Sequence, residues 1–76
     1  MSHYDYLVDA SGEACPMPLL RAKMQLNKML AGECVKVVAT DAGSVRDFVS
    51  FINLTAHELT QDEDDPSVFV YYIVKR

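Results

Sequence analysis

The chain has 76 residues, of which 50% are apolar, so it is large enough for one small hydrophobic core and too short for a second. We therefore expect a single domain over residues 1–76, with a functional site on its surface rather than a deep cofactor pocket. The formal net charge of -4 argues against direct binding to nucleic acid, because clustered Lys and Arg are needed to bind a phosphate backbone.

The sequence contains no apolar run close to the roughly 20 residues that cross a bilayer. The segment from Met1 to Asp5 lacks the basic and apolar regions of a signal peptide, so we expect a cytoplasmic protein that does not contact a membrane. Cys15 and Cys34 are too far apart for a Cys-x-x-Cys pair, and a reducing compartment leaves both as thiols. Neither a structural disulfide nor a metal cluster is expected.

In chain order, the first element is Tyr4–Asp9, whose alternating aromatic and branched side chains predict a short strand ending at a turn with Gly12. The residues after Cys15 predict an amphipathic helix that Gly32 ends. Prolines are tolerated in its first turn, where backbone amides have no intrahelical partner. The apolar residues that recur at three- and four-residue steps are Leu19, Ala22, Leu26, Met29 and Leu30.

Cys34–Thr40 is rich in valine and predicts a buried strand, after which Ser44 begins a second helix. Ser44 and Asp47 have the spacing of a capping box, and Val45, Phe48, Val49 and Ile52 recur at i, i+3, i+4 and i+7. His57–Gln61 and Ser67–Val74 then predict two more strands.

The acidic segment Asp62–Pro66 between those last strands predicts an exposed turn. A calcium loop is not expected there, because its oxygen ligands recur over about twelve residues around a glycine.

The order strand, helix, strand, helix, strand, strand predicts an α+β fold, namely a two-layer sandwich with a mixed four-stranded sheet and both helices on one face. The first two strands form a parallel crossover and the last two a hairpin. On the sheet face opposite the helices, Lys36 is polar but half of the outward positions look apolar, so we expect a monomer or a weak dimer.

Cys15 precedes Pro16 at the start of the first helix, which is a favourable place for a reactive thiol. The thiolate is the reactive species, and the partial positive charge of a helix N-terminus stabilises it. Pro16 and Pro18 stiffen the backbone around it. We therefore expect Cys15 to be more acidic than Cys34, which is interpreted as a small buried hydrophobe, with a resolving role as the alternative.

Three basic residues, Arg21, Lys23 and Lys28, fall within the first predicted helix and predict a small positive face beside Cys15 for an acidic protein partner. An ordinary solvated helix surface explains these charges equally well. His3 and His57 have no obvious orienting partner, so a hydrolase that uses either as the base for Cys15 is not favoured.

The spacing Asp9-x-x-Gly12-x-x-Cys15-Pro16-x-Pro18 resembles the signature of the TusA, SirA and YedF family of small sulfur-carrier proteins. The resemblance extends over most of the chain, since further residues fall where the family pattern places them: Gly32, Glu33, Asp41, Arg46, Asp47, Phe51, Leu59, Tyr72 and Ile73. Many relatives have Asp-Pro before the second helix and a cysteine after its phenylalanine, whereas this chain has Asp41-Ala42 and Phe51-Ile52.

The resemblance implies a sulfur carrier that receives a persulfide on Cys15 from a protein donor such as a cysteine desulfurase and relays it to a protein acceptor. It implies a sulfurtransferase-like relay without a cofactor or metal, for tRNA thiolation, molybdenum-cofactor enzymes or other sulfur trafficking. The chain ends Val74-Lys75-Arg76, so a ubiquitin-like carrier with a Gly-Gly end is not expected. The alternative is a regulatory or protein-interaction module in which Cys15 is incidental or senses redox state.

Overall fold

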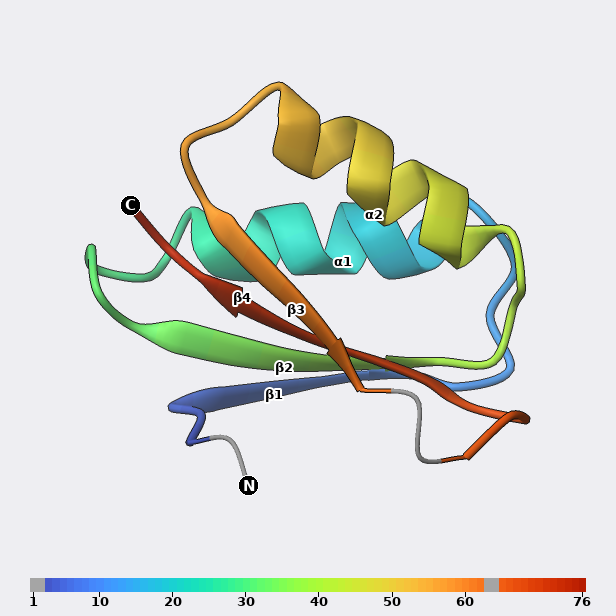
Figure 1. Ribbon diagram of the computed structural model, residues 1–76. Coiled ribbons are helices and arrows are strands. Elements are labelled where there is room, and N and C mark those ends of the chain that lie inside the picture. The colour runs from blue at the N-terminus through green and yellow to red at the C-terminus, as the bar shows by residue number, and fades with distance from the viewer. Residues whose placement is uncertain (1–2, 63–64) are drawn as a thin grey trace.

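The computed structural model describes residues 3–62 and 65–76 of the chain. Its strands are β1 (Tyr6–Ala10), β2 (Cys34–Ala39), β3 (Glu58–Asp62) and β4 (Phe69–Val74), and its helices are α1 (Met17–Leu26) and α2 (Ser44–Asn53). The strands form one sheet in the order β1-β2-β4-β3, and both helices lie on the same face of it (Figure 1). The predicted α+β two-layer sandwich and its order of elements are confirmed.

The pairing of the strands places two loops side by side. β1 runs parallel to β2, with Ala10 opposite Ala39 where both strands end. β4 pairs antiparallel with β2 and with β3, so β3 and β4 form the predicted hairpin. Because parallel strands end at the same edge of a sheet, the loop from β1 to α1 lies beside the loop from β2 to α2.

The first and last strands begin two residues later than predicted. β1 starts at Tyr6 rather than Tyr4, and β4 starts at Phe69 rather than Ser67. Asp5 nevertheless extends the contact with β2, because its carboxylate accepts the amide hydrogen of Cys34 at 2.9 Å. The predicted acidic turn includes residues 63 and 64, which lie outside the described part of the chain; the described Asp65 accepts the amide of Ser67 at 2.9 Å.

The first helix ends at Leu26, so the prediction that it continues to Leu30 is wrong. The amides of Lys28 and Met29 donate to carbonyls three residues earlier, which forms a turn rather than a further helical turn. The ammonium of Lys75 donates to the carbonyls of Leu26 and Met29 at 2.7 Å and thereby satisfies the open end of the helix. Met29 still reaches the core, whereas Leu30 is exposed.

The core lies between the sheet and the helices. Its two largest side chains are the ring of Phe48 from α2 and the ring of Tyr71 from β4, which stack with centroids 4.3 Å apart. The hydroxyl of Tyr71 shares a hydrogen bond of 2.8 Å with that of Ser44, the one buried polar side chain among the described residues. The other buried members of the core cluster are Ala22, Leu26, Met29, Val35, Val37, Ala39 and Ile73.

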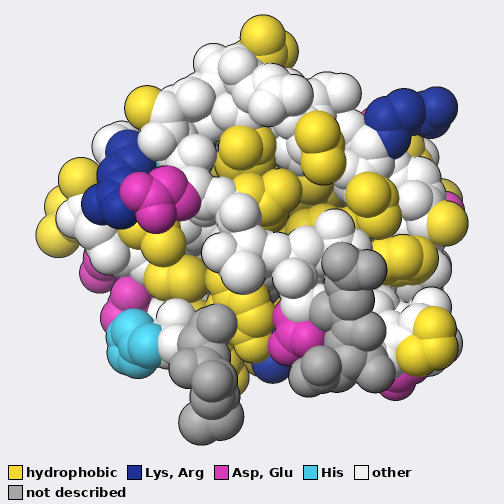
Figure 2. Space-filling model, in the orientation of Figure 1, with side chains coloured by type: hydrophobic (Ala, Val, Ile, Leu, Met, Phe, Trp, Pro, Cys, Tyr) yellow, Lys and Arg dark blue, Asp and Glu magenta, His cyan; other side chains and the backbone are white. Residues whose placement is uncertain are grey.

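Apolar side chains also remain on the surface. Figure 2 shows them gathered across the middle of the face below α2, where charged side chains are sparse. On the sheet face opposite the helices, the ammonium of Lys36 lies 5.3 Å from the ring centre of Tyr4 and 5.8 Å from that of Tyr72. None of the helices in the described ranges is long and apolar enough to cross a membrane.

Candidate functional site

Cys15 lies in the loop between β1 and α1, and the neighbouring loop between β2 and α2 fixes its backbone. The amide of Gly12 donates to the hydroxyl of Thr40 at 2.8 Å, and the amide of Cys15 donates to Oδ2 of Asp41 at 3.0 Å. Gly43 permits this approach, because a Cβ there would lie 3.1 Å from the same Asp41 oxygen and 3.6 Å from Cβ of Cys15. The two loops therefore form one unit with an exposed thiol.

The thiol of Cys15 has a carboxylate as its hydrogen-bond partner. Its Sγ donates to Oδ2 of Asp47, which is carried by the first turn of α2. This hydrogen bond raises the pKa of Cys15, and partial burial and the negative charges of Asp47 and Asp41 raise it further. The positive charge of Arg46 acts in the opposite direction on the pKa but is the smallest contribution.

The pKa of Cys15 is thus raised and not lowered, and the prolines help to explain why the helix N-terminus does not prevail. That Cys15 is more acidic than Cys34 stays a prediction, because the pKa of Cys34 is raised as well. Pro16 caps α1 and Pro18 occupies its second position, so neither supplies a backbone N–H. The amide of Met17 is already occupied, because it donates to the carbonyl of Ala14 at 2.9 Å. The terminus thus has few free donors for an anion, while the Asp47 carboxylate contacts the sulfur directly.

The position of Asp47 depends on the packing of α2 against β4. Ser44 and Phe48, which precede and follow Asp47 on this helix, are both buried, and both contact Tyr71. The predicted capping box is wrong, because Gly43 is the N-cap and makes no side-chain capping hydrogen bond. The hydroxyl of Ser44 binds Tyr71 instead, and the carboxylate of Asp47 is free to face Cys15.

The residues of the predicted motif shape the loop rather than contact the thiol. Asp9 accepts the amide of Ser11 at 3.0 Å, and hydrogen bonds from that serine lower the pKa of Asp9. Gly12 has a φ of 80°, a conformation in which side chains other than glycine are strained. Pro18 is buried, whereas Pro16 is exposed like Cys15.

Of the three predicted basic residues, Arg21 and Lys23 lie on α1, and each of these two already has a partner. Nε of Arg21 is 2.6 Å from a carboxylate oxygen of Glu13, which raises the pKa of Arg21. The ammonium of Lys23 lies 5.1 Å from the ring centre of Phe51 on α2. Lys28 lies beyond the end of α1 and is therefore separated from Cys15 by the length of the helix.

An apolar stripe on α1 was not predicted. Met17, Leu20 and Met24 are spaced at i, i+3 and i+7, and between 43% and 63% of each residue is exposed. Because Met17 follows the Cys15-Pro16 pair, this exposed stripe begins at the thiol and runs along the helix. The predicted core positions Ala22 and Leu26 lie on the buried side.

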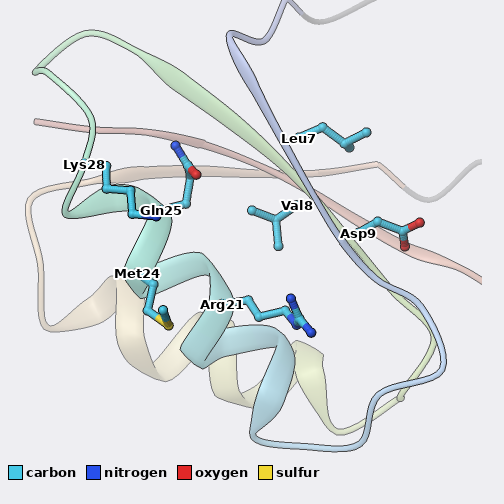
Figure 3. Close-up of a pocket in the computed structure, with 7 residues that line it drawn as sticks. All are labelled: Leu7, Val8, Asp9, Arg21, Met24, Gln25 and Lys28. Carbon is cyan, nitrogen blue, oxygen red and sulfur yellow. The ribbon is translucent and has the colours of Figure 1, made fainter.

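A shallow groove of about 260 Å³ lies between β1 and α1 and does not include the thiol. In Figure 3, Leu7, Val8 and Asp9 come from the strand, with Val8 pointing toward the helix. The opposite wall is formed by Arg21, Met24, Gln25 and Lys28.

The other residues considered in the sequence lie away from Cys15. Cys34 is buried, as predicted, and burial raises its pKa. His3 pairs with Asp5 at 3.0 Å, so the expectation that it lacks a partner is wrong, but Asp5 contacts Cys34 at the opposite end of the sheet. Nδ1 of His57 accepts the amide of Arg76. Across residues 3–62 and 65–76, no group of three or more His, Cys, Asp or Glu side chains is arranged to hold a metal ion.

Comparison with known proteins decides the family. The family model described as sulfurtransferase TusA matches residues 6–75. The chain belongs to the TusA family. It is 44% identical over 75 residues to the sulfur carrier protein TusA of Allochromatium vinosum, covering 99% of each chain. It is also 34% identical over 71 residues to the putative sulfur carrier protein YrkI of Bacillus subtilis, covering 93% of this chain and 95% of that one.

The fold comparison agrees with this TusA-family assignment. The crystal structure of a SirA-like protein from Desulfitobacterium hafniense superposes with a TM-score of 0.82 and 28% identity, covering 92% of this chain and 96% of that one. The protein is accordingly a sulfur carrier, which exchanges sulfur with donor and acceptor proteins. Thr40, Asp41 and Asp47 are the site residues that the motif alone did not identify.

Proposed function

We propose that this sulfur carrier holds its sulfur as a persulfide on Cys15 and works in the cytoplasm between a cysteine desulfurase and a protein thiol acceptor. The observation that carries the proposal is the contrast between the two cysteines. Cys15 is exposed in a loop fixed by Thr40 and Asp41, whereas Cys34 is 7% exposed and belongs to the core.

The transfer is an exchange between sulfur atoms without net oxidation or reduction. The thiolate of Cys15 attacks the outer sulfur of the donor persulfide, and a new sulfur–sulfur bond forms as the donor's own breaks. The inner sulfur of the donor leaves with the bonding electron pair as a thiolate and takes up the proton that Cys15 has lost. Attack by an acceptor thiolate on the outer sulfur repeats the exchange and returns Cys15 as a thiolate.

Intact-mass measurement tests this assignment. The reduced protein is incubated with a cysteine desulfurase and free cysteine, and we expect a mass gain of one sulfur atom. The gain should disappear in Cys15→Ser and persist in Cys34→Ala, the matched control for the other thiol. If several desulfurases transfer no sulfur to the folded wild type, or if the gain survives in Cys15→Ser, Cys15 is not the carrier residue. The first of these results would favour the interaction-module alternative.

We further propose that partners dock on α1 beside Cys15, through the exposed stripe of Met17, Leu20 and Met24 and the basic residues Arg21 and Lys23. Exposed apolar side chains next to a reactive residue favour protein contact. Arg21→Glu and Lys23→Glu should each slow sulfur loading by the desulfurase, because charged rim residues govern encounter rates.

The control for these charge reversals is Lys28→Glu, which makes the same charge change beyond the far end of α1. Equal loading rates for all three variants would place the docking surface elsewhere. Circular dichroism of each variant separates slowed transfer from loss of fold.

A further inference from the structure

The contact between Cys15 and Asp47 is unusual for a cysteine that must react as a thiolate. A carboxylate next to a thiol stabilises the protonated form, since the thiol can donate a hydrogen bond to it and the thiolate is repelled by it. Reactive cysteines more commonly lie beside cations or free amides. Here the charged groups that influence the pKa of the sulfur are two carboxylates, those of Asp47 and Asp41, and one cation, Arg46.

The fold holds the carboxylate in place. Asp47 lies between Ser44 and Phe48 on α2, and both neighbours are buried against Tyr71. Cys15 is held from the other side, because its amide donates to Asp41. The contact therefore joins two anchored segments that are 32 residues apart in the sequence.

We propose that Asp47 restrains Cys15 in the free carrier, holding the thiol protonated and aimed at α2 until a sulfur donor docks. The inference deepens the proposed function and rests on it, since Cys15 is the residue that receives the sulfur. The raised pKa of Cys15 is the electrostatic counterpart of this geometry. A carrier restrained in this way reacts slowly with small electrophiles and oxidants, which attack the thiolate.

The magnitude follows from the thiolate population. Removing the carboxylate charge that contacts the thiol lowers the pKa of Cys15, and we expect the thiolate fraction at pH 7 to rise about tenfold. A less basic thiolate is also a weaker nucleophile, with a Brønsted slope of about 0.4–0.5. The net increase in reaction rate at pH 7 is then about three- to fourfold.

The test is the pH dependence of Cys15 alkylation by iodoacetamide, an uncharged reagent, in variants that also carry Cys34→Ala. Asp47→Asn keeps the shape of the side chain and removes its charge. We expect the rate profile of this variant to shift to lower pH and its rate at pH 7 to increase by that factor. Asp47→Ser serves the same purpose if the asparagine variant does not fold, as judged by circular dichroism.

Glu58→Gln is the matched control, because it removes the same charge at the end of the sheet away from Cys15. Glu58 pairs there with Val74, which also pairs with Cys34 at the start of β2. It should leave the profile unchanged. An unchanged profile in Asp47→Asn would overturn the inference, and a slower reaction at pH 7 would overturn it too by indicating that Asp47 acts as a base. The desulfurase assay is separate: if wild type gains no sulfur on Cys15, the proposed function fails whatever the alkylation result.

Discussion

The buried hydrogen bond between Ser44 and Tyr71 joins α2 to the sheet, and its loss should destabilise the fold measurably. The two hydroxyl oxygens are 2.8 Å apart, and both residues are at most 1% exposed, so water does not replace a missing partner. Tyr71→Phe leaves the hydroxyl of Ser44 unpaired, and Ser44→Ala leaves that of Tyr71 unpaired. A buried polar group without a partner costs about 1–3 kcal/mol, and we take about 2 kcal/mol for each variant.

The double variant distinguishes this hydrogen bond from simple loss of packing. Ser44→Ala combined with Tyr71→Phe removes both polar groups, so no unpaired hydroxyl remains and the combined loss should be about 1–2 kcal/mol smaller than the sum of the single losses. Urea denaturation measures these differences. With a slope of about 1 kcal/mol per molar urea for a domain of this size, each single variant should unfold about 2 M earlier than wild type. Strictly additive losses would refute the hydrogen bond and, with it, the way in which α2 holds Asp47.

Three further predictions concern the loop and the two thiols. Gly12→Ala should lower the free energy of unfolding by about 1–2 kcal/mol in the same urea assay. The cost is backbone strain and not a steric clash, because the φ of 80° strains any other residue while no atom lies within 4 Å of the added methyl group. Asp9→Asn should flatten the pH dependence of stability, as measured by acid titration followed by circular dichroism. The pKa of Asp9 is lowered in the folded state, so the ionised carboxylate stabilises the fold above the unfolded pKa of 3.8, and this stabilisation is lost as the pH falls below that value. Alkylation of the native protein followed by peptide mass mapping should label Cys15 and spare Cys34, and equal labelling of both would contradict the burial of Cys34.

The fold was largely predictable because its signals are local and periodic. The valine-rich run from Cys34 predicts a strand whose start is confirmed, and the i, i+3, i+4, i+7 pattern from Val45 predicts α2. The end of α1 was not predictable in the same way. The apolar steps continue through Met29 and Leu30, but Lys75 satisfies the carbonyls that a longer helix would use, and it comes from the other end of the chain.

The site was predictable only in part. The motif identified the exposed thiol and its turn, but the environment of the thiol depends on residues brought together by the parallel pairing of β1 and β2. Ser44 and Asp47 illustrate the difference, because their spacing predicts a local capping box. In the structure each side chain has a distant partner instead, Tyr71 for Ser44 and Cys15 for Asp47. Spacing along the sequence describes local partners and carries little information about such contacts.

The acidity of Cys15 is decided by which charge lies nearest to the sulfur. The N-terminus of α1 amounts to about half a positive charge spread over free amides, and its effect falls off within the first turn. Pro16 and Pro18 remove two of those amides, and the amide of Met17 is occupied. Asp47 brings a full negative charge into contact with the sulfur. Neutralising Asp47 should therefore reveal whatever stabilisation the helix end provides, and Asp41→Asn in addition should lower the pKa of Cys15 further. If the double variant titrates like an ordinary cysteine and no lower, the prolines have removed the helix-terminus effect altogether, and they serve this loop only by fixing its shape.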